Sequence, residues 1–452
     1  MKVLFIVNQL FFFRHIEPVV SALISDGDQV GMWFGDREKE NISDRAVQEF
    51  LSLHRVDYFH GISLRNDRWK VVLKVIRDLQ GCRIYLKPGY TAPKSRIRFL
   101  EKLSPFARSV VGSRLGKWIL SKEISYYFLS FMERLIPANK AISRELGRKT
   151  PDIVVIVTNL IWNAPEFEYL KASISLGIPT VAMIASWDNL NTKGTLNLIP
   201  DAIILWNQAL AEDAMILHHF PREKIVSTGA QTFDYLFDFK PTESIAEFCM
   251  RTGIDPARKF VLYLGSSASI AEDETRFVRE LVSSLNKNLN VQVLIRPHPI
   301  NHKIWASFDE AGAIVWPRNG DLPDTIGAKE DFCKALYFSQ AVIGINTSAM
   351  LEAAVLDRPC ITIMLDDYKA SQDESGHFRH LLNGGFLEIA EDFDQASEIL
   401  KRILNGEDRL KKNRKRFVSE FIRPRGINRP VGPLIAELIE QLDPKKGILA
   451  HA

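Results

Sequence analysis

Cysteines and long apolar runs are both scarce in this sequence, and each scarcity excludes a class of protein. The four cysteines stand far apart and form no CxxC pair: Cys82, Cys249, Cys333 and Cys360. Such spacing argues against a disulfide framework and against a structural zinc site, and it is typical of a reducing compartment. No segment approaches the roughly 18 consecutive apolar residues that a membrane-spanning helix requires.

The apolar run at the start of the sequence lacks most features of a signal peptide. Asn8 and Gln9 interrupt the run, charged Arg14 and Glu17 follow it, and no cleavage site of small residues is present. We therefore interpret it as a buried strand and not as an export signal. With the cysteine pattern, this indicates a cytoplasmic protein.

A strong excess of charge of one sign is missing as well. The formal net charge is only +3 over 452 residues, so the overall charge indicates no nucleic-acid partner. A content of 46% hydrophobic and 25% charged residues is that of a folded globular protein. Because a chain of this length exceeds one ordinary hydrophobic core, we expect two domains.

Short apolar runs alternate with helical patterns, which is typical of parallel α/β domains. In the first half the expected strands are 3–7, 30–34, 153–157, 180–185, 202–206 and 225–227. In the second half they are 260–264, 291–295, 313–316, 341–345 and 360–364. The expected helices include 165–176, 273–287, 348–356 and 431–442. We predict two Rossmann-like doubly wound domains that face a central ligand cleft at the carboxyl ends of their strands.

The domains are expected at 1–240 and 241–430, followed by a C-terminal helix and tail at 431–452. The first boundary is placed at the polar segment Lys240–Thr242. A helical basic insertion of about 91–148 is expected to interrupt the first domain.

This insertion begins with a basic stretch that contains a single acid, Glu101. Its basic residues are Lys94, Arg96, Arg98, Lys102, Arg108, Arg114, Lys117 and Lys122. Apolar residues such as Phe106 and Trp118 are interleaved with them. The pattern fits an amphipathic segment on an anionic membrane surface. The alternative is a pair of inserted helices whose charged face is simply solvated.

The most informative motif is the turn Asn346-Thr347-Ser348 between an expected strand and an expected helix. Backbone N–H groups and hydroxyls at a helix N-terminus suit a donor phosphate. Glu352 lies one helical turn further on and is expected to reach a donor hydroxyl. The alternative is an ordinary helix N-cap.

Two further loops follow expected strands in the second half. Arg296 and His298 lie in a turn that Pro297 and Pro299 make rigid. Arginine suits bidentate phosphate recognition, and histidine donates to phosphate or exchanges a proton near neutral pH. The alternative is a surface turn with incidental charge. A third loop carries the small residues Ser266 and Ser267, which allow a phosphate to approach the backbone but match no phosphate-binding motif.

Candidates for acceptor chemistry stand in the first half. Arg14 and His15 follow the first strand, where a histidine can act as a base. Asp188 is a second candidate base, with Trp187 and Asn189 beside it to contact an acceptor. The alternatives are a structural His15 and an Asx-turn with Trp187 in the core.

These motifs together resemble the GT-B superfamily of glycosyltransferases. The second half looks like the CDP-glycerol glycerophosphotransferase branch and related transferases of surface polysaccharides. The residues that carry this resemblance are Arg296-Pro297-His298-Pro299, Asn346-Thr347-Ser348 with Glu352, Arg358-Pro359 and Asp366-Asp367-Tyr368. The resemblance implies that His298, Thr347 and Ser348 contact donor phosphates. It also implies that His15 is the base and that no metal is bound.

The sequence departs from the branch at two places. The branch usually has an aspartate before paired serines and another where Glu352 stands, whereas this chain has Asn346-Thr347-Ser348. We therefore leave the donor open among UDP-, CDP- and CMP-linked groups. The turn Val226–Gln231 resembles a stretch of UDP-N-acetylglucosamine 2-epimerases, which share the fold.

The interpretation is a transferase that moves a sugar or polyol-phosphate group from a nucleotide-activated donor to a surface-carbohydrate or lipid-linked acceptor. No bound cofactor or metal and no nucleic acid is expected, and the location is cytoplasmic, with peripheral attachment to the inner face of the membrane. The alternatives are an epimerase and a non-catalytic protein that binds nucleotide sugars or lipids.

Overall fold

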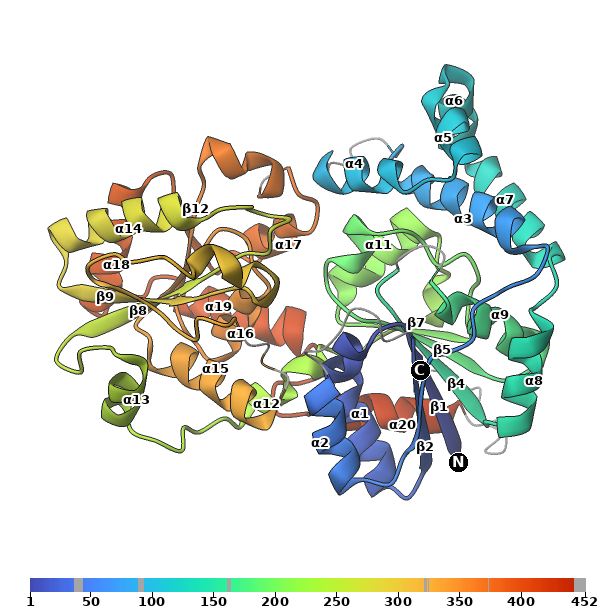
Figure 1. Ribbon diagram of the computed structural model, residues 1–452, viewed down its shortest axis with the longest axis horizontal. Helices are drawn as coiled ribbons and strands as arrows, with labels where there is room; N and C mark the ends of the chain where they lie inside the picture. The colour runs from blue at the N-terminus through green and yellow to red at the C-terminus, as the bar shows by residue number, and fades with distance from the viewer. Residues whose placement is uncertain are drawn as a thin grey trace. The chain divides into compact units, whose positions relative to one another are not determined.

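The computed structural model describes residues 1–35, 44–87, 93–160, 164–320, 323, 325–372 and 374–442. The chain forms two compact units (Figure 1). Unit 1 comprises Met1–Asp234 and the segment from Phe421 onward, and unit 2 comprises Tyr235–Glu420. The units therefore meet at 234/235 and at 420/421. The boundaries expected from the sequence, 240/241 and 430/431, both lie later in the chain.

Unit 1 is built on a seven-stranded sheet of order β3-β2-β1-β4-β5-β6-β7. Its strands are β1 (Lys2–Val7), β2 (Gln29–Phe34), β3 (Asp57–His60), β4 (Ile153–Thr158), β5 (Thr180–Ile184), β6 (Ala202–Leu205) and β7 (Ile225–Ser227). All pairs are parallel. The central strands are buried on both faces, which explains their unbroken apolar sequences.

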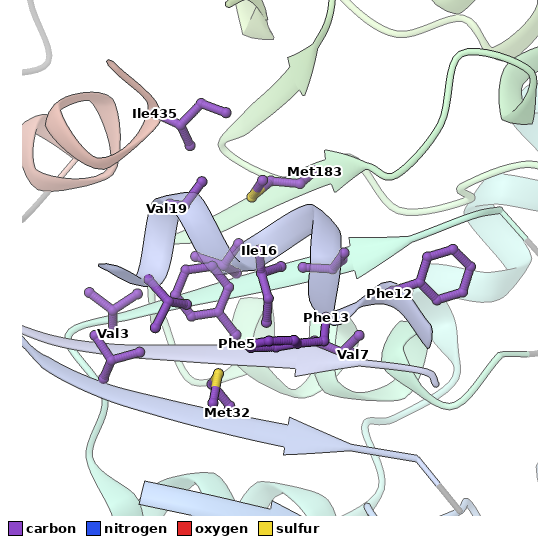
Figure 2. Close-up of a cluster of buried hydrophobic side chains, with 14 of the residues drawn as sticks. Val3, Phe5, Val7, Phe12, Phe13, Ile16, Val19, Met32, Met183 and Ile435 are labelled. Atoms are coloured by element: carbon purple, nitrogen blue, oxygen red, sulfur yellow. The ribbon is translucent and has the colours of Figure 1, made fainter. Parts of the chain in front are cut away.

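Helices cover the faces of this sheet. They are α1 (Phe13–Ser25), α2 (Asp44–Leu53), α9 (Glu166–Ser175), α10 (Asn189–Thr192), α11 (Gln208–His218) and α20 (Val431–Gln441). Figure 2 shows α1 lying over β1 and β2, with Ile16 directed at Phe5 and Met32. Ile435 of α20 lies beside Val19 of α1, so residues from both ends of the described chain share one core.

The chain returns to unit 1 through contacts that fix α20 in place. The Asp234 carboxylate accepts hydrogen bonds from the backbone N–H groups of Val431 (3.0 Å) and Gly432 (2.7 Å) at the N-terminus of α20. It also pairs with Arg423 at 2.7 Å. A Cβ on Gly229, whose φ is +126°, would lie 2.7 Å from the Ile422 carbonyl oxygen, so this position requires glycine.

A helical insertion separates β3 from β4. Its helices are α3 (Lys70–Ile84), α4 (Pro93–Glu101), α5 (Pro105–Gly112), α6 (Arg114–Ser121), α7 (Glu123–Leu135) and α8 (Lys140–Lys149). The sequence predicted that the helical insertion begins at about residue 91. The helices begin earlier, with Lys70 of α3. Residues 91 and 92 and the side chains of Lys94 and Arg98 lie outside the described residues.

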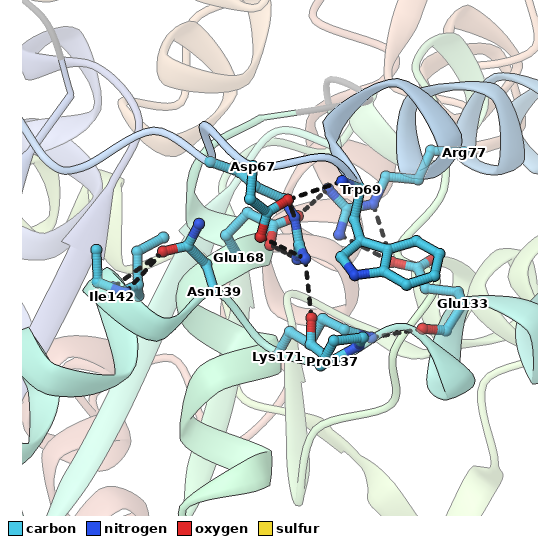
Figure 3. Close-up of polar contacts among 11 residues, drawn as sticks. Asp67, Trp69, Arg77, Glu133, Pro137, Asn139, Ile142, Glu168 and Lys171 are labelled. Carbon is cyan, nitrogen blue, oxygen red and sulfur yellow. Dashed lines mark hydrogen bonds and ion pairs between the residues drawn. The ribbon is translucent and has the colours of Figure 1, made fainter.

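Buried ion pairs join the insertion to unit 1 (Figure 3). The Arg77 guanidinium pairs with Glu133 of α7 at 2.8 Å and with Glu168 of α9 at 2.7 Å. Arg65 pairs with the other oxygen of Glu168 at 2.8 Å. Burial alone lowers the pKa of Arg77, but the two carboxylates raise it above its ordinary value.

Unit 2 is built on a six-stranded sheet of order β10-β9-β8-β11-β12-β13, again with every described pair parallel. Its strands are β8 (Lys259–Leu264), β9 (Val291–Arg296), β10 (Ala313–Val315), β11 (Val342–Gly344), β12 (Cys360–Ile363) and β13 (Leu387–Ala390). Its α-helices are α13 (Ile245–Thr252), α14 (Thr275–Asn288), α15 (Ile326–Phe338), α16 (Ala349–Val355), α17 (Phe378–Asn383), α18 (Phe393–Leu404) and α19 (Lys411–Phe417). Helix α12 (Asp234–Phe237) begins at the boundary, and two 3-10 helices, η4 (Pro299–Trp305) and η5 (Asp366–Ser371), follow β9 and β12.

The predicted doubly wound architecture is confirmed in both units, and each expected strand is present to within one or two residues. The expectation missed β3 and β13. Both are short, and each carries residues that are only partly buried, so neither has a continuous apolar run.

We predict that Arg77→Met destabilises unit 1 by about 3–5 kcal/mol, because it leaves buried carboxylates without their partner. Urea denaturation of the variant measures the loss. Arg108→Met is the matched control, since Arg108 is an exposed arginine of the same insertion and should change stability by less than about 0.5 kcal/mol. Equal midpoints for the two variants would contradict the structural role of the Arg77 network.

Candidate functional site

The strand order of unit 2 places three loops at one edge of its sheet. β9 lies on one side of β8 and β11 on the other, so the connections that leave β8 and β11 diverge at this point. Ligands of open α/β sheets bind at such a switch point, beyond the carboxyl ends of the strands. The loops that follow β8, β9 and β11 contain the donor-site candidates.

The loops after β8 and β9 pack directly against each other. The Gly265 N–H donates to the Arg296 carbonyl oxygen at 3.0 Å. A Cβ on Gly265 would lie only 3.0 Å from the His298 nitrogen of the backbone, so a larger residue would push the loops apart. Within the loop 265–269, the hydroxyls of Ser267 and Ser269 lie 2.6 Å apart.

His298 is held by its own turn. Its Nδ1 accepts a hydrogen bond from the Ile300 N–H at 3.2 Å and caps η4. Because Nδ1 is an acceptor here, the proton of the neutral imidazole is on Nε2. The ring therefore has an Nε2–H group with which to donate to an anion.

The sequence predicted that the Arg296 side chain is displayed on the turn, but the structure places this side chain elsewhere. It is the last residue of β9 and is only 6% exposed. Its guanidinium lies over the Phe332 ring of α15, 4.8 Å from the ring centroid. The strand register with Leu264 places it inside unit 2 instead of on the proline-rich turn.

Asn346, in the loop after β11, belongs to a buried polar cluster. This cluster includes a histidine, His377, from the segment after β12. The Asn346 amide donates to the Ser371 carbonyl oxygen and lies 3.4 Å from Nε2 of His377. Nδ1 of His377 is 2.7 Å from the Ser375 hydroxyl. Asn346 is therefore held within unit 2 by the segment after β12.

The other residues of this loop are more accessible. Thr347 is half-buried and Ser348 is exposed at the start of α16, which has 7 residues. Glu352 accepts a hydrogen bond from the Tyr235 hydroxyl at 3.2 Å. The structure thus pairs Glu352 with a residue at the beginning of unit 2.

Two polar residues near the edge were missed by the sequence analysis, His377 and Glu274. Glu274 accepts hydrogen bonds from the Ser266 N–H at 2.7 Å and from the Tyr263 hydroxyl at 2.8 Å. Burial raises the pKa of its carboxyl to about 7. In the sequence it stands in the acidic run Glu272–Glu274, which gives no sign that its last member is buried.

In unit 1, His15 is helical and buried. The expectation placed it in a loop after the first strand, but α1 begins at Phe13 and His15 is 3% exposed. Burial, and then the Arg14 guanidinium, lowers its pKa well below the ordinary value of a histidine. The Arg14 Nε lies 3.4 Å from the His15 Nε2, which brings the two residues together.

The turn after β5 has the geometry of the Asx alternative. Oδ1 of Asn189 accepts from the Ser186 N–H at 3.0 Å, and its amide donates to Asp188 at 3.1 Å. Asp188 also accepts from the Thr192 hydroxyl at 3.3 Å. Trp187 is 2% exposed, so in this structure it packs in the core instead of offering a face to an acceptor.

Within the described ranges, no group of three or more His, Cys, Asp or Glu side chains is placed to hold a metal ion. No helix in those ranges has the length and apolar content needed to cross a bilayer.

Comparison with known proteins finds a family to which unit 2 is similar. The sequence model of the CDP-glycerol:poly(glycerophosphate) glycerophosphotransferases matches residues 207–425, which include the whole of unit 2. No curated protein matches the sequence.

Solved structures with the same fold cover nearly the whole chain. A UDP-GlcNAc 2-epimerase from Methanocaldococcus jannaschii is 13% identical, with a TM-score of 0.56, and the match covers 97% of this chain and 99% of that one. A UDP co-structure of MnaA from S. aureus is 11% identical, with a TM-score of 0.57 and coverage of 100% and 98%. A glycosyltransferase from Rickettsia africae is 10% identical, with a TM-score of 0.54 and coverage of 98% of each chain.

At these identities the structural likeness shows the fold alone, whereas the family match adds the class of reaction. Both the fold and the family resemblance expected from the sequence are confirmed. The chain therefore has the fold of these epimerases and of this glycosyltransferase, and its segment 207–425 is similar to the CDP-glycerol:poly(glycerophosphate) glycerophosphotransferase family.

Proposed function

We propose that the chain transfers a polyol-phosphate or sugar group from a nucleotide-activated donor, bound at the carboxyl edge of unit 2, to a hydroxyl of a surface-carbohydrate or lipid-linked acceptor. The observation that carries the proposal is the close packing of the Gly265 loop against the turn of His298. It gathers hydroxyls, backbone N–H groups and an imidazole N–H at the switch point of a transferase-family unit.

In this proposal the charge that develops on the departing nucleotide is stabilised by groups already in position. The Nε2–H of His298 donates to a donor phosphate, and the hydroxyls of Ser267 and Thr347 provide further donors. Fixed donors of this kind lower the transition state because they need no reorganisation during the reaction. Arg296, held over Phe332, adds positive charge beneath the turn.

The acceptor hydroxyl must lose a proton to a base. His15 and Asp188 remain the candidates, and their environments differ. The lowered pKa of His15 keeps its imidazole neutral and makes it a weak base. Asp188 is a carboxylate that accepts hydrogen bonds from Asn189 and Thr192 within its own turn.

The nucleotide is the first point to test. We predict that one of UDP, CDP, CMP and GDP raises the thermal midpoint of the wild type, and that His298→Ala abolishes the shift. Binding at 100 times Kd stabilises the native state by about 2.7 kcal/mol. His302→Ala is the matched control, because the Nδ1–H of this histidine of the same turn donates to the Pro299 carbonyl oxygen (2.7 Å).

A wild type that no nucleotide stabilises would contradict the proposed function and would favour the non-catalytic alternative. A shift that survives in His298→Ala would leave a nucleotide-binding protein whose site is elsewhere.

We also propose that the helical insertion attaches the protein to an anionic bilayer, where a lipid-linked acceptor would be presented. Exposed apolar side chains of α7 recur at helical spacing along one side: Ile124, Tyr127, Phe128, Phe131 and Leu135. Those of α6 are Leu115, Trp118 and Ile119. We call this set the apolar face of α6 and α7. The opposite side of α7 is buried, which fits an amphipathic helix lying on a membrane.

The basic residues around this face favour an anionic lipid surface as its binding partner. Arg114, Lys117 and Lys122 are exposed around it, and the Lys122 Nζ lies 5.1 Å above the Trp118 ring. Each basic residue near an anionic bilayer contributes about 1 kcal/mol. Lysine with an aromatic neighbour is typical of the membrane interface, where both an apolar body and a polar tip are solvated.

We predict that the protein sediments with vesicles that contain phosphatidylglycerol, that binding weakens as salt is raised, and that the double variant Trp118→Ser/Phe128→Ser loses it. The matched control is Met250→Ser/Ile300→Ser, which removes exposed apolar side chains from unit 2. Binding unaffected by the first pair of substitutions would overturn the assignment. A dimer in solution that those substitutions dissociate would assign the face to a second copy of the chain.

A further inference from the structure

Glu274 occupies an unusual place for an acid at the start of a helix. It precedes α14 and has no side-chain bond to the N-terminus of that helix. Its carboxylate is instead 0% exposed and faces the sheet, where it meets the Tyr263 hydroxyl of β8 and the Ser266 N–H of the following loop. One carboxylate thus holds both strand β8 and the loop that follows it.

The described contacts of this carboxylate are a phenol and an amide, and neither is a cation. Burial of a carboxylate without a cationic partner is costly, and burial accordingly raises its pKa to about 7. The hydrogen bonds from Tyr263 and Ser266 oppose this effect, and the neighbouring Asp273 adds to it. Tyr368 of η5 is a further titratable group that faces Tyr263 in this cluster.

The loop that Glu274 holds is the one that packs against the His298 turn. Gly265 is bonded to Arg296 on one side, and Ser266 is bonded to Glu274 on the other. The Ser267 carbonyl then accepts from the N–H groups of Ile270 (2.8 Å) and Ala271 (3.1 Å), which closes the loop into a turn. The Ser266 hydroxyl is buried as well.

We propose that Glu274 is a positioning residue for the donor phosphates: its buried carboxylate fixes the backbone of Gly265–Ser267, so that the loop presents its N–H groups and hydroxyls beside His298. This inference rests on the proposed function, because it assumes a donor at this edge. Glu274 acts through Ser266 and does not itself touch the donor. Its protonation converts one of two acceptor oxygens into a donor, which can no longer accept from both Tyr263 and Ser266.

The affinity for the donor should therefore depend on the charge of Glu274. As the pH falls through about 7, the carboxyl gains a proton, and the hydrogen bond that holds the loop, from the Ser266 N–H, weakens because a neutral carboxyl is a poorer acceptor than a carboxylate. A donor with both phosphates esterified, such as CDP-glycerol or UDP-N-acetylglucosamine, is the suitable probe, because its phosphates have no second ionisation in this range. The other titratable groups of the site are the same in the wild type and in variants of Glu274.

The experiment compares donor affinity and donor KM at pH 6 and pH 8 for the wild type, Glu274→Gln and Glu280→Gln. Glu280 is the matched control, as a partly exposed glutamate of α14 that pairs with Arg276. We expect the wild type and Glu280→Gln to bind up to about tenfold more weakly at pH 6, which is one unit below the pKa of Glu274. Glu274→Gln should bind weakly at both values, with the KM of the acceptor unchanged.

Tyr263→Phe provides a second measurement if Glu274→Gln does not fold. It removes only the hydroxyl that stabilises the charged carboxylate, so the pKa of Glu274 should rise and the loss of affinity should move to higher pH. An unmoved pH profile would overturn the inference, as would Glu274→Gln behaving like Glu280→Gln. In either case donor binding by the wild type keeps the proposed function intact, whereas no binding at any pH overturns both.

Discussion

Both units depend on the parallel pairing of their strands, because this pairing brings the carboxyl end of every strand to one edge of its sheet. Parallel strands need crossover helices, and these helices bury the sheet on both faces. The interior then has little room for polar groups, which are confined to the edge where loops leave the strands. In unit 2, the loops after β8, β9 and β11 meet there at the switch point. The position of the candidate donor site thus follows from the strand order of the sheet, whatever side chains the loops carry.

The strands could be predicted from the sequence because doubly buried strands leave unbroken apolar runs. The loops that carry candidate site residues could also be placed, since each follows such a run. The orientation of single side chains could not. Arg296 was expected on the turn, but one position of register makes it the last residue of β9 and places its guanidinium over Phe332. His15 was expected in a loop, but α1 begins two residues earlier and buries it.

The remaining differences between the prediction and the structure come from contacts that the sequence pattern does not reveal. Glu274 stands in an acidic run that looks solvated, and only the position of Tyr263 in the folded sheet shows that it is buried. His377 has no motif around it, yet it lies beside Asn346, the residue at which the chain departs from the pattern of the family that it resembles. At Asp188, local hydrogen bonding within the turn competes with a catalytic role, and the sequence pattern is the same for both.

The helical insertion combines buried ion pairs and exposed aromatic side chains with an apolar core of its own. Its ion pairs, Arg77 with Glu133 and Glu168, are buried, whereas aromatic residues such as Trp118 and Phe128 are exposed. The buried network adds directional contacts between the insertion and α9, beside the apolar core of the insertion. Trp118 and Phe128 remain on the outer surface.

The packing of α20 in the core of unit 1 has a consequence for the order in which the protein is assembled. Val431 and Ile435 pack with α1, and Asp234 caps the helix that contains them. Unit 2 is contiguous in sequence, so all of its strands are available to one another as soon as Glu420 has left the ribosome. Unit 1 begins earlier but needs residues 431–441 to close its core, so the unit that starts second is the first that can be finished. During synthesis the part of α1 that packs against α20 must therefore remain uncovered while an entire domain is made and folds.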